Sequence, residues 1–385
     1  MRPRILRDVP AQRLAYRLEA DVSTPLDSRI DDPADKLASI QDDFNTRRKD
    51  ELLALIRTVK SPDGLRVLAL YGTDDESTAL FRIDLYSSDG KFIRNMIPPD
   101  LSCVFPDAVA WSPDGNFITF IAHRRVLPTP TPTPPQASVP EPGASPLPLP
   151  SVAPAFAPVA TFTTEQIYIS NRDGYDLKPL TSREGLIYFY YSWSPDAHGL
   201  VALACKEDEW NARERQFKMP AGRPRLLDLD GSERLLDDGI TEALPVWSPD
   251  ASKVATAFES DVAIYDVGGT KPTQARVPLG DQLIAASVRY EQRTGAKKEE
   301  SGQKNSSGAA NSSKHSATPQ PTPVPSSSGQ PAIPASFNPI IRLEWTSPEK
   351  LYFQTAFVRL MPSETINTFQ RWHLLNLSAQ AVILK

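Results

Sequence analysis

Apolar residues along this chain gather in short runs, and similar polar turns separate consecutive runs. The runs are too short and too rich in β-branched and aromatic residues to be helices, so the pattern predicts strands. Five turns each join two such runs, which predicts five hairpins of largely buried strands. The first strands are expected at 52–59, 107–111, 187–193, 242–247 and 340–345, and the second strands at 66–72, 117–122, 199–205, 253–258 and 350–357.

Each of these turns is a copy of one short sequence. It reads SPDG at 61–64, WSPDG at 111–115, WSPDA at 193–197 and 247–251, and WTSPE at 345–349. Ser begins the turn, Pro sets φ at the next position, and Asp with Gly tolerates the remaining backbone angles. We expect the Trp that ends the first strand in four copies to be a core anchor between sheets rather than a ring that stacks on a ligand. The residues of this structural repeat are Ser61, Pro62, Asp63, Trp111, Ser112, Pro113, Asp114, Trp193, Ser194, Pro195, Asp196, Trp247, Ser248, Pro249, Asp250, Trp345 and Pro348.

A second strand–turn–strand pattern follows each hairpin, at 79–96, 166–181, 223–238, 262–279 and 369–384. Four copies turn at Asp-Gly or Gly-Gly, sequences that favour two-residue hairpin loops, and the last copy has Leu-Ser-Ala-Gln instead. The repeating unit is therefore four antiparallel strands. A unit of about 40–50 residues with four strands is typical of a β-propeller blade. The sequence predicts an all-β fold, a β-propeller of four-stranded antiparallel blades.

The turn WSPDG, with the later stretch IYISNRDGYDLKPLT, resembles the Pro-Asp repeat (PD40) of TolB-like β-propellers, also called WD40-like. The resemblance covers about residues 52–385 apart from two inserts. It implies a non-catalytic role in protein–protein binding in the bacterial cell envelope. Related propellers also gate prolyl-oligopeptidase-like enzymes. The last copy departs from the pattern, with Glu349 in place of Asp and one extra residue, and no TolB-type N-terminal domain is recognisable.

Five blades are explicit in the sequence, whereas the family commonly has six. Residues 1–51 contain one expected strand, at 13–22, and one expected helix, at 31–44, with Asp32 as N-cap and Pro33 at the first position. We expect this segment to pack on the propeller of residues 52–385 or to close it onto the last blade with one strand. Five blades and an irregular sixth blade both remain open.

Two inserts of biased composition interrupt the repeats. Residues 128–158 hold 12 of the chain's 38 prolines, and residues 294–336 are rich in Ser, Gly, Lys and Pro and contain no aromatic residue. Such compositions cannot bury enough apolar surface to offset chain entropy, so both inserts are expected to be disordered. Both should leave from the propeller face that also carries the charged connection 206–223.

This connection, KEDEWNARERQFKMPAGR, is the candidate partner-binding site. It combines charges of both signs with Trp210 and Phe217, and Trp with Arg is common at the centres of protein interfaces. The candidate residues are Trp210, Arg213, Arg215 and Phe217. The alternative is a solvated loop with its aromatic side chains folded onto the blade.

The sequence shows no catalytic constellation. It lacks a G-x-S-x-G motif, and its four histidines are not spaced as metal ligands, so we predict no catalytic residues, metal or cofactor. A hydrolase or lyase with its site in the central channel, or a ligand-binding or sensor propeller, remains the alternative. Two cysteines, Cys103 and Cys205, exclude a disulfide framework, and whether they pair is open.

The net charge and the hydropathy of the chain limit the kinds of partner that we expect. The net charge of −5 does not indicate nucleic acid, and no apolar stretch approaches the roughly 20 residues that cross a bilayer. We therefore expect a protein partner and a monomeric chain. The resemblance implies a periplasmic or envelope location with a true start further upstream. The alternative is a cytoplasmic protein, because the given N-terminus does not read as a signal peptide.

Overall fold

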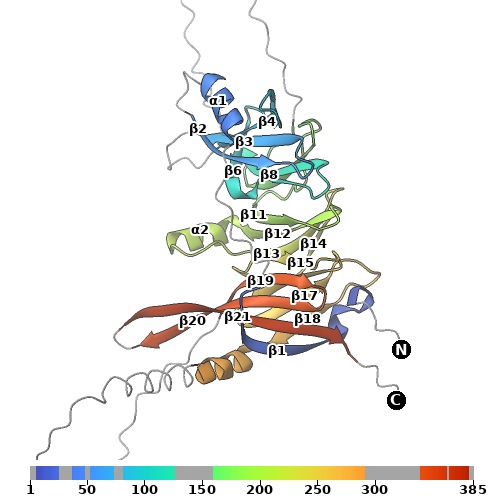
Figure 1. The fold of residues 1–385 in the computed structure, drawn as a ribbon, viewed down its shortest axis with the longest axis vertical. Helices are drawn as coiled ribbons and strands as arrows, with labels where there is room; N and C mark the ends of the chain where they lie inside the picture. Colours follow the sequence, from blue (N-terminus) through green and yellow to red (C-terminus); the bar gives the residue numbers. More distant parts are fainter. Residues whose placement is uncertain are drawn as a thin grey trace, which may run out of the picture. The chain divides into compact units, whose positions relative to one another are not determined.

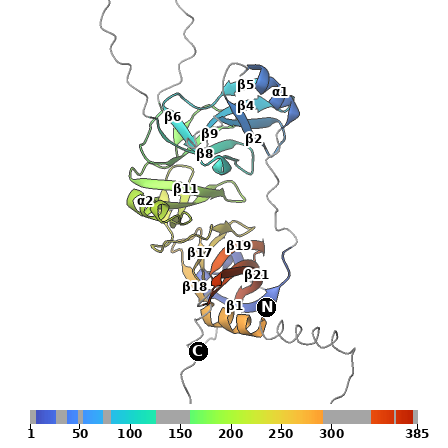
Figure 2. The same cartoon turned by 90° about the vertical axis from the view of Figure 1, so that its left-hand side faces the viewer.

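The computed structural model describes residues 6–25, 37–47, 53–72, 81–125, 159–290, 339–361 and 364–380. Most regular structure in these ranges is β-strand, in four-stranded antiparallel arrangements (Figures 1 and 2). The predicted all-β fold of four-stranded antiparallel blades is thus confirmed. The chain divides into two compact units, residues 29–240 and residues 1–28 with 241–385. Both inserts, 128–158 and 294–336, lie outside the described residues. The expectation that they leave from one face of the propeller therefore stays a prediction.

The unit of residues 29–240 contains three blades. Blade 1 comprises β2 (Ala54–Lys60), β3 (Arg66–Gly72), β4 (Phe81–Ser87) and β5 (Phe92–Asn95). Blade 2 comprises β7 (Ala110–Trp111), β8 (Phe117–Arg124), β9 (Gln166–Asn171) and β10 (Lys178–Pro179). Blade 3 comprises β11 (Leu186–Trp193), β12 (Gly199–Lys206), β13 (Arg223–Asp228) and β14 (Glu233–Leu235).

The first strand of blade 2 is less regular than its sequence predicts. Instead of one strand over 107–111, β6 (Leu101–Val104) pairs with the end of β8, and β7 pairs with its beginning. Phe105, with φ of +59°, and the 3₁₀ turn η4 (Pro106–Ala108) interrupt the strand between them. Because Cys103 on β6 also pairs with Phe81 on β4, blades 1 and 2 form one continuous sheet.

Helix α1 (Ala38–Arg47) covers one face of blade 1 (Figure 1). Its buried side chains Ile40 and Phe44 pack with Tyr71 and other residues of β2–β4, and the Arg47 guanidinium lies 2.9 Å from the fully buried carboxylate of Asp84. The described helix lies at the end of the expected range 31–44 and extends beyond it. The expected cap residues at 32 and 33 lie outside the described ranges.

The other unit contains blades 4 and 5. Blade 4 comprises β15 (Val246–Trp247), β16 (Lys253–Phe258), β17 (Asp261–Asp266) and β18 (Gln274–Pro278), and residues 280–290 after it are helical. Blade 5 comprises β19 (Ile340–Ser347), β20 (Lys350–Met361), β21 (Glu364–Ala379) and, at its edge, β1 (Leu14–Val22). Two 3₁₀ turns, η1 (Leu6–Asp8) and η2 (Ala11–Arg13), precede β1.

The prediction of a hairpin within 369–384 is wrong. Residues up to Ala379 continue as one strand, because Leu-Ser-Ala-Gln contains no Gly, Asn or Asp to supply the positive φ of a tight hairpin. The fourth strand of blade 5 comes instead from the N-terminus, where β1 runs antiparallel to β21 from Leu14↔Ala379 to Val22↔Trp372. The expected N-terminal strand is therefore present and pairs with the last blade.

Tryptophans connect neighbouring blades within the unit of residues 29–240. The indole N–H of Trp111 donates to the carbonyl of Val59 in blade 1 over 3.1 Å, and that of Trp193 donates to the Thr119 hydroxyl in blade 2 over 2.9 Å. Both side chains are buried, so they are core anchors between blades, as predicted. Trp345 likewise packs against the core that blades 4 and 5 share.

Candidate functional site

Each Ser-Pro-Asp turn is closed by its own side chains. In the first copy the Ser61 hydroxyl donates to Asp63 over 2.6 Å and accepts from the Arg66 N–H over 2.9 Å. The next three copies repeat the Ser-to-Asp bond at 2.6, 2.7 and 2.6 Å. The residue after Asp adopts a left-handed conformation, with φ of +70° at Gly64 and +56° at Ala251. The repeated sequence is therefore explained by the local geometry of the turn.

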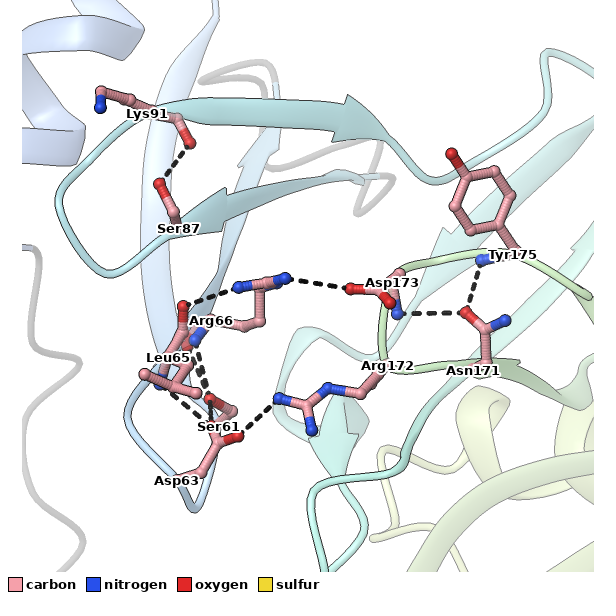
Figure 3. Close-up of polar contacts among 10 residues, drawn as sticks. All are labelled: Ser61, Asp63, Leu65, Arg66, Ser87, Lys91, Asn171, Arg172, Asp173 and Tyr175. Carbon is pink, nitrogen blue, oxygen red and sulfur yellow. Dashed lines mark hydrogen bonds and ion pairs between the residues drawn. The ribbon is translucent and has the colours of Figure 1, made fainter.

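Figure 3 shows how charges at one such turn pair with one another. Arg172, in the turn between β9 and β10, lies 2.5 Å from Asp63, and Arg66 lies 3.2 Å from Asp173. Hydrogen bonds from Ser61 and from the Leu65 N–H, together with Arg172, lower the pKa of Asp63 to about 2. These charged groups bridge blades 1 and 2, so this end of the blades is held together by its own side chains.

The connection 206–223 leaves from the opposite end of a blade. It begins where β12 ends, while the Ser194 turn stands where β12 begins. An eight-residue strand spans about 26 Å, so the two features are far apart on blade 3. Residues 207–215 form helix α2 (Glu207–Arg215), which projects from the blade (Figure 1).

A charged pair fastens α2 to blade 3. Glu209 in the first turn of α2 accepts the Lys206 N–H over 2.9 Å and receives two bonds from the Arg223 guanidinium, at 2.7 and 2.8 Å. The Arg223 hydrogen bonds are the largest cause that lowers the pKa of Glu209 to about 2. Because Arg223 is the first residue of β13, this pair ties the start of the helix to the strand that follows it.

Trp210 belongs to α2, and its side chain packs against blades 2 and 3. Its ring centroid is 5.8 Å from that of Phe105 and 5.6 Å from that of Phe189, and its side chain is half-buried. This arrangement matches the alternative in which an aromatic side chain of the connection folds onto the blade. Trp210 therefore helps to orient α2.

Phe217 has the opposite environment. It is 99% exposed and follows the end of α2 with φ of +52°. The Phe217 N–H donates to the Glu214 carbonyl over 2.9 Å and the Lys218 N–H to the Arg213 carbonyl over 3.1 Å, the bonding of a Schellman motif. The structure thus brings Arg213, Arg215 and Phe217 together at one end of α2, and Trp210 lies apart from them against the blade.

Met219 completes this end of the helix, and the sequence did not single it out. It is 71% exposed, and its carbonyl accepts a 2.7 Å hydrogen bond from Arg213 Nε. Arg215 Nε donates to the Asn211 carbonyl over 3.1 Å. We call residues 213–220 the α2 tip. A single Met carries no periodic signal in a sequence, so only the exposed fraction in the folded chain identifies it.

Both cysteine thiols of the described chain are buried. Cys103 and Cys205 are both free, and desolvation raises the pKa of each thiol. Within the described ranges no three His, Cys, Asp or Glu side chains gather as metal ligands do. The part of the chain described here also contains no helix that is long and apolar enough to cross a membrane.

Comparison with known proteins gives only distant structural likeness. No protein-family model matches the sequence, and no curated protein matches it. Prolyl oligopeptidase B from Galerina marginata matches with a TM-score of 0.40 and 10% identity, over 92% of this chain and 42% of that one. The N-terminal domain of Nup159 matches with a TM-score of 0.37 and 11% identity, over 97% and 69%. An oligogalacturonate lyase in complex with manganese matches with a TM-score of 0.30 and 12% identity, over 58% and 52%.

The matches to prolyl oligopeptidase B and to Nup159 are distant matches to β-propeller domains. The chain spans only 30% to 52% of the length of the first five solved structures that it matches. With TM-scores this low, the matches assign neither a family nor an activity to this chain.

Proposed function

We propose that this protein is a non-catalytic protein–protein interaction scaffold that binds a partner through the α2 tip. The observation that supports this most is the nearly complete exposure of Phe217. Large aromatic side chains are usually buried in a monomer and are enriched where proteins bind one another. An exposed aromatic side chain beside Met219, Arg213 and Arg215 fits the composition of an interface, where aromatic residues, Met and Arg are enriched.

The blade supports such a role because it anchors α2, the helix that carries the tip. Glu209 and Arg223 hold the start of α2, and Trp210 packs against the blade. A site that is already ordered loses less conformational entropy when it binds. The turn end of the blades differs, because charged side chains there, such as Asp63 and Arg172, already pair within the chain.

The proposed setting is the bacterial cell envelope, with the chain as a monomer. Its only support is the resemblance of the Ser-Pro-Asp repeat to TolB-like propellers. Fractionation of cells that carry the native locus tests it, and recovery of the protein in the cytoplasm alone would contradict an envelope location.

The binding site itself is tested by photo-crosslinking in cells. A photo-reactive amino acid replaces Phe217 in one variant and Leu65 in a control variant. Leu65 is a suitable control because it is a large apolar residue that is 54% exposed. It lies beside a Ser-Pro-Asp turn, whereas α2 leaves from the end of a blade that lies opposite these turns. We expect discrete adducts with another protein at position 217 only. Equal adducts at both positions, or none at 217, would contradict the proposal.

A further inference from the structure

We infer that the partner of the α2 tip offers an apolar pocket with a rim of carboxylates, and that Phe217 enters this pocket. The inference rests on the proposed function and adds the chemistry of the partner.

The apolar part consists of two large side chains that the fold does not use. Phe217 is 99% exposed and Met219 is 71% exposed, and only Lys218 separates them. Neither belongs to a hydrophobic cluster of the unit of residues 29–240. Removing a large apolar side chain from water is favourable, so a pocket that receives both Phe217 and Met219 gains affinity.

The backbone shows that Phe217 is not placed there for stability. Its φ of +52° lies in the left-handed region, which is unfavourable for a non-Gly residue because Cβ approaches the following carbonyl oxygen. Gly or Asn usually occupies this position of a Schellman motif, because only small or locally hydrogen-bonding residues tolerate it well. In the isolated chain Phe217 is therefore unfavourable both in conformation and in exposure, which indicates a role in contact with another molecule.

The charge of the α2 tip defines the rim. Residues 213–220 contain Arg213, Arg215 and Lys218 against one carboxylate, Glu214, although the whole chain has a net charge of −5. The carboxylates of Glu207 and Asp208 lie at the other end of the nine-residue helix, about 13 Å away along its axis. Complementary charges around an interface favour the correct partner and speed association, so basic residues around Phe217 predict acidic residues around the pocket.

Hydrogen bonds hold the apolar side chains next to these cations. Arg213 Nε donates to the Met219 carbonyl over 2.7 Å, and the Lys218 N–H donates to the Arg213 carbonyl over 3.1 Å. The turn after α2 is therefore closed before any partner binds. Phe217 is presented on a preformed support, which reduces the entropy lost on binding.

The test uses a displayed library of random peptides, selected on the full-length wild-type protein. Enriched peptides are synthesised, and their affinities are measured by calorimetry against wild type, F217G, F217L and the double variant R215E/K218E. We expect enriched peptides that combine large apolar residues with Asp or Glu. Loss of an anchoring side chain should weaken binding at least tenfold in F217G, whereas F217L should retain most of it.

Charge and folding are controlled separately. R215E/K218E should also weaken binding at least tenfold, and raising the salt concentration should weaken wild-type binding. F217G should melt at the same or a higher temperature than wild type, because Gly relieves the left-handed strain, so its loss of binding would not reflect unfolding.

Three results would overturn the inference. Enriched peptides without acidic residues, or affinity unchanged by R215E/K218E, would show that the rim is not acidic, while crosslinks at position 217 would still support the proposed function. Binding of the protein to phosphatidylglycerol vesicles that is lost in F217G would show that the tip meets a lipid surface instead. Peptides that all bind F217G as tightly as wild type would show that Phe217 is not the anchor.

Discussion

Trp193 offers a direct test of how the blades are held together. Its buried ring stacks on Phe117 with centroids 6.4 Å apart, and its N–H donates to the Thr119 hydroxyl over 2.9 Å. Replacing a buried Trp by Ala typically costs about 3–5 kcal/mol, so Trp193→Ala should remove a large part of the stability of this unit. A more informative perturbation keeps an aromatic ring at position 193 and removes the hydrogen bond.

A double-mutant cycle with Trp193→Phe and Thr119→Val isolates that bond. Thr119→Val leaves a buried indole N–H without an acceptor, which costs about 1–3 kcal/mol. Trp193→Phe removes the donor and some apolar contact, at a cost of about 1–2 kcal/mol. In the double variant neither the donor nor the acceptor of this bond is left unpaired. Its loss of unfolding free energy should therefore be smaller than the sum of the two single losses by about 1 kcal/mol.

The assay is urea unfolding followed by far-ultraviolet circular dichroism on all four proteins. Leu65→Ala is the matched control, because an exposed apolar side chain should contribute within about 0.5 kcal/mol. If the two single losses simply add, then Trp193 and Thr119 do not interact across the blades, and the account of Trp as an inter-blade anchor is wrong.

Three further predictions concern buried or strained groups. Glu209→Gln should cost about 2 kcal/mol by weakening the Arg223 bonds. Since the pKa of Glu209 is lowered to about 2, its contribution to stability is complete above the ordinary pKa of about 4.5 and is lost as pH falls toward 2. Limited proteolysis of α2 across this pH range would detect the loss. Ala251→Gly should raise the free energy of unfolding by up to about 1 kcal/mol, because Ala251 has a φ of +56°. A higher melting temperature would show this gain. Asp266→Asn leaves the buried Lys253 ammonium, 3.0 Å away, without its counter-charge, so urea unfolding should show a loss of about 3 kcal/mol; an unchanged midpoint would contradict it.

The candidate site could be predicted only in part. The sequence of 206–223 indicated an unusual mixture of aromatic and charged residues, and the structure does bring Arg213, Arg215 and Phe217 together. The sequence did not indicate helix α2. It also did not indicate that Trp210 would pack on the blade while Phe217 would not. A sequence lists two aromatic residues in one connection, but which of them is covered depends on Phe105 and Phe189, which come from other segments.

The local elements of this protein were determined by the sequence alone. Ser61 and Asp63 close their turn with hydrogen bonds that span at most five residues, so the turn and the two strands beside it can be predicted from a short stretch. Apolar residues on both faces of those strands likewise predict stacked sheets, because each face must be covered.

Only the tertiary structure decided which distant segments meet. The fourth strand of blade 5 is β1, whose residue Leu14 pairs with Ala379, and Ala11 donates a 3.0 Å hydrogen bond to Asp266 in blade 4. No local preference distinguishes β1 from any other edge strand, and the failed prediction of a hairpin in 369–384 shows how easily a nearer segment is chosen instead. The physical reason is that turn geometry depends on neighbouring residues, whereas strand pairing across the chain depends on the complementary burial of two surfaces that exist only once the rest has folded.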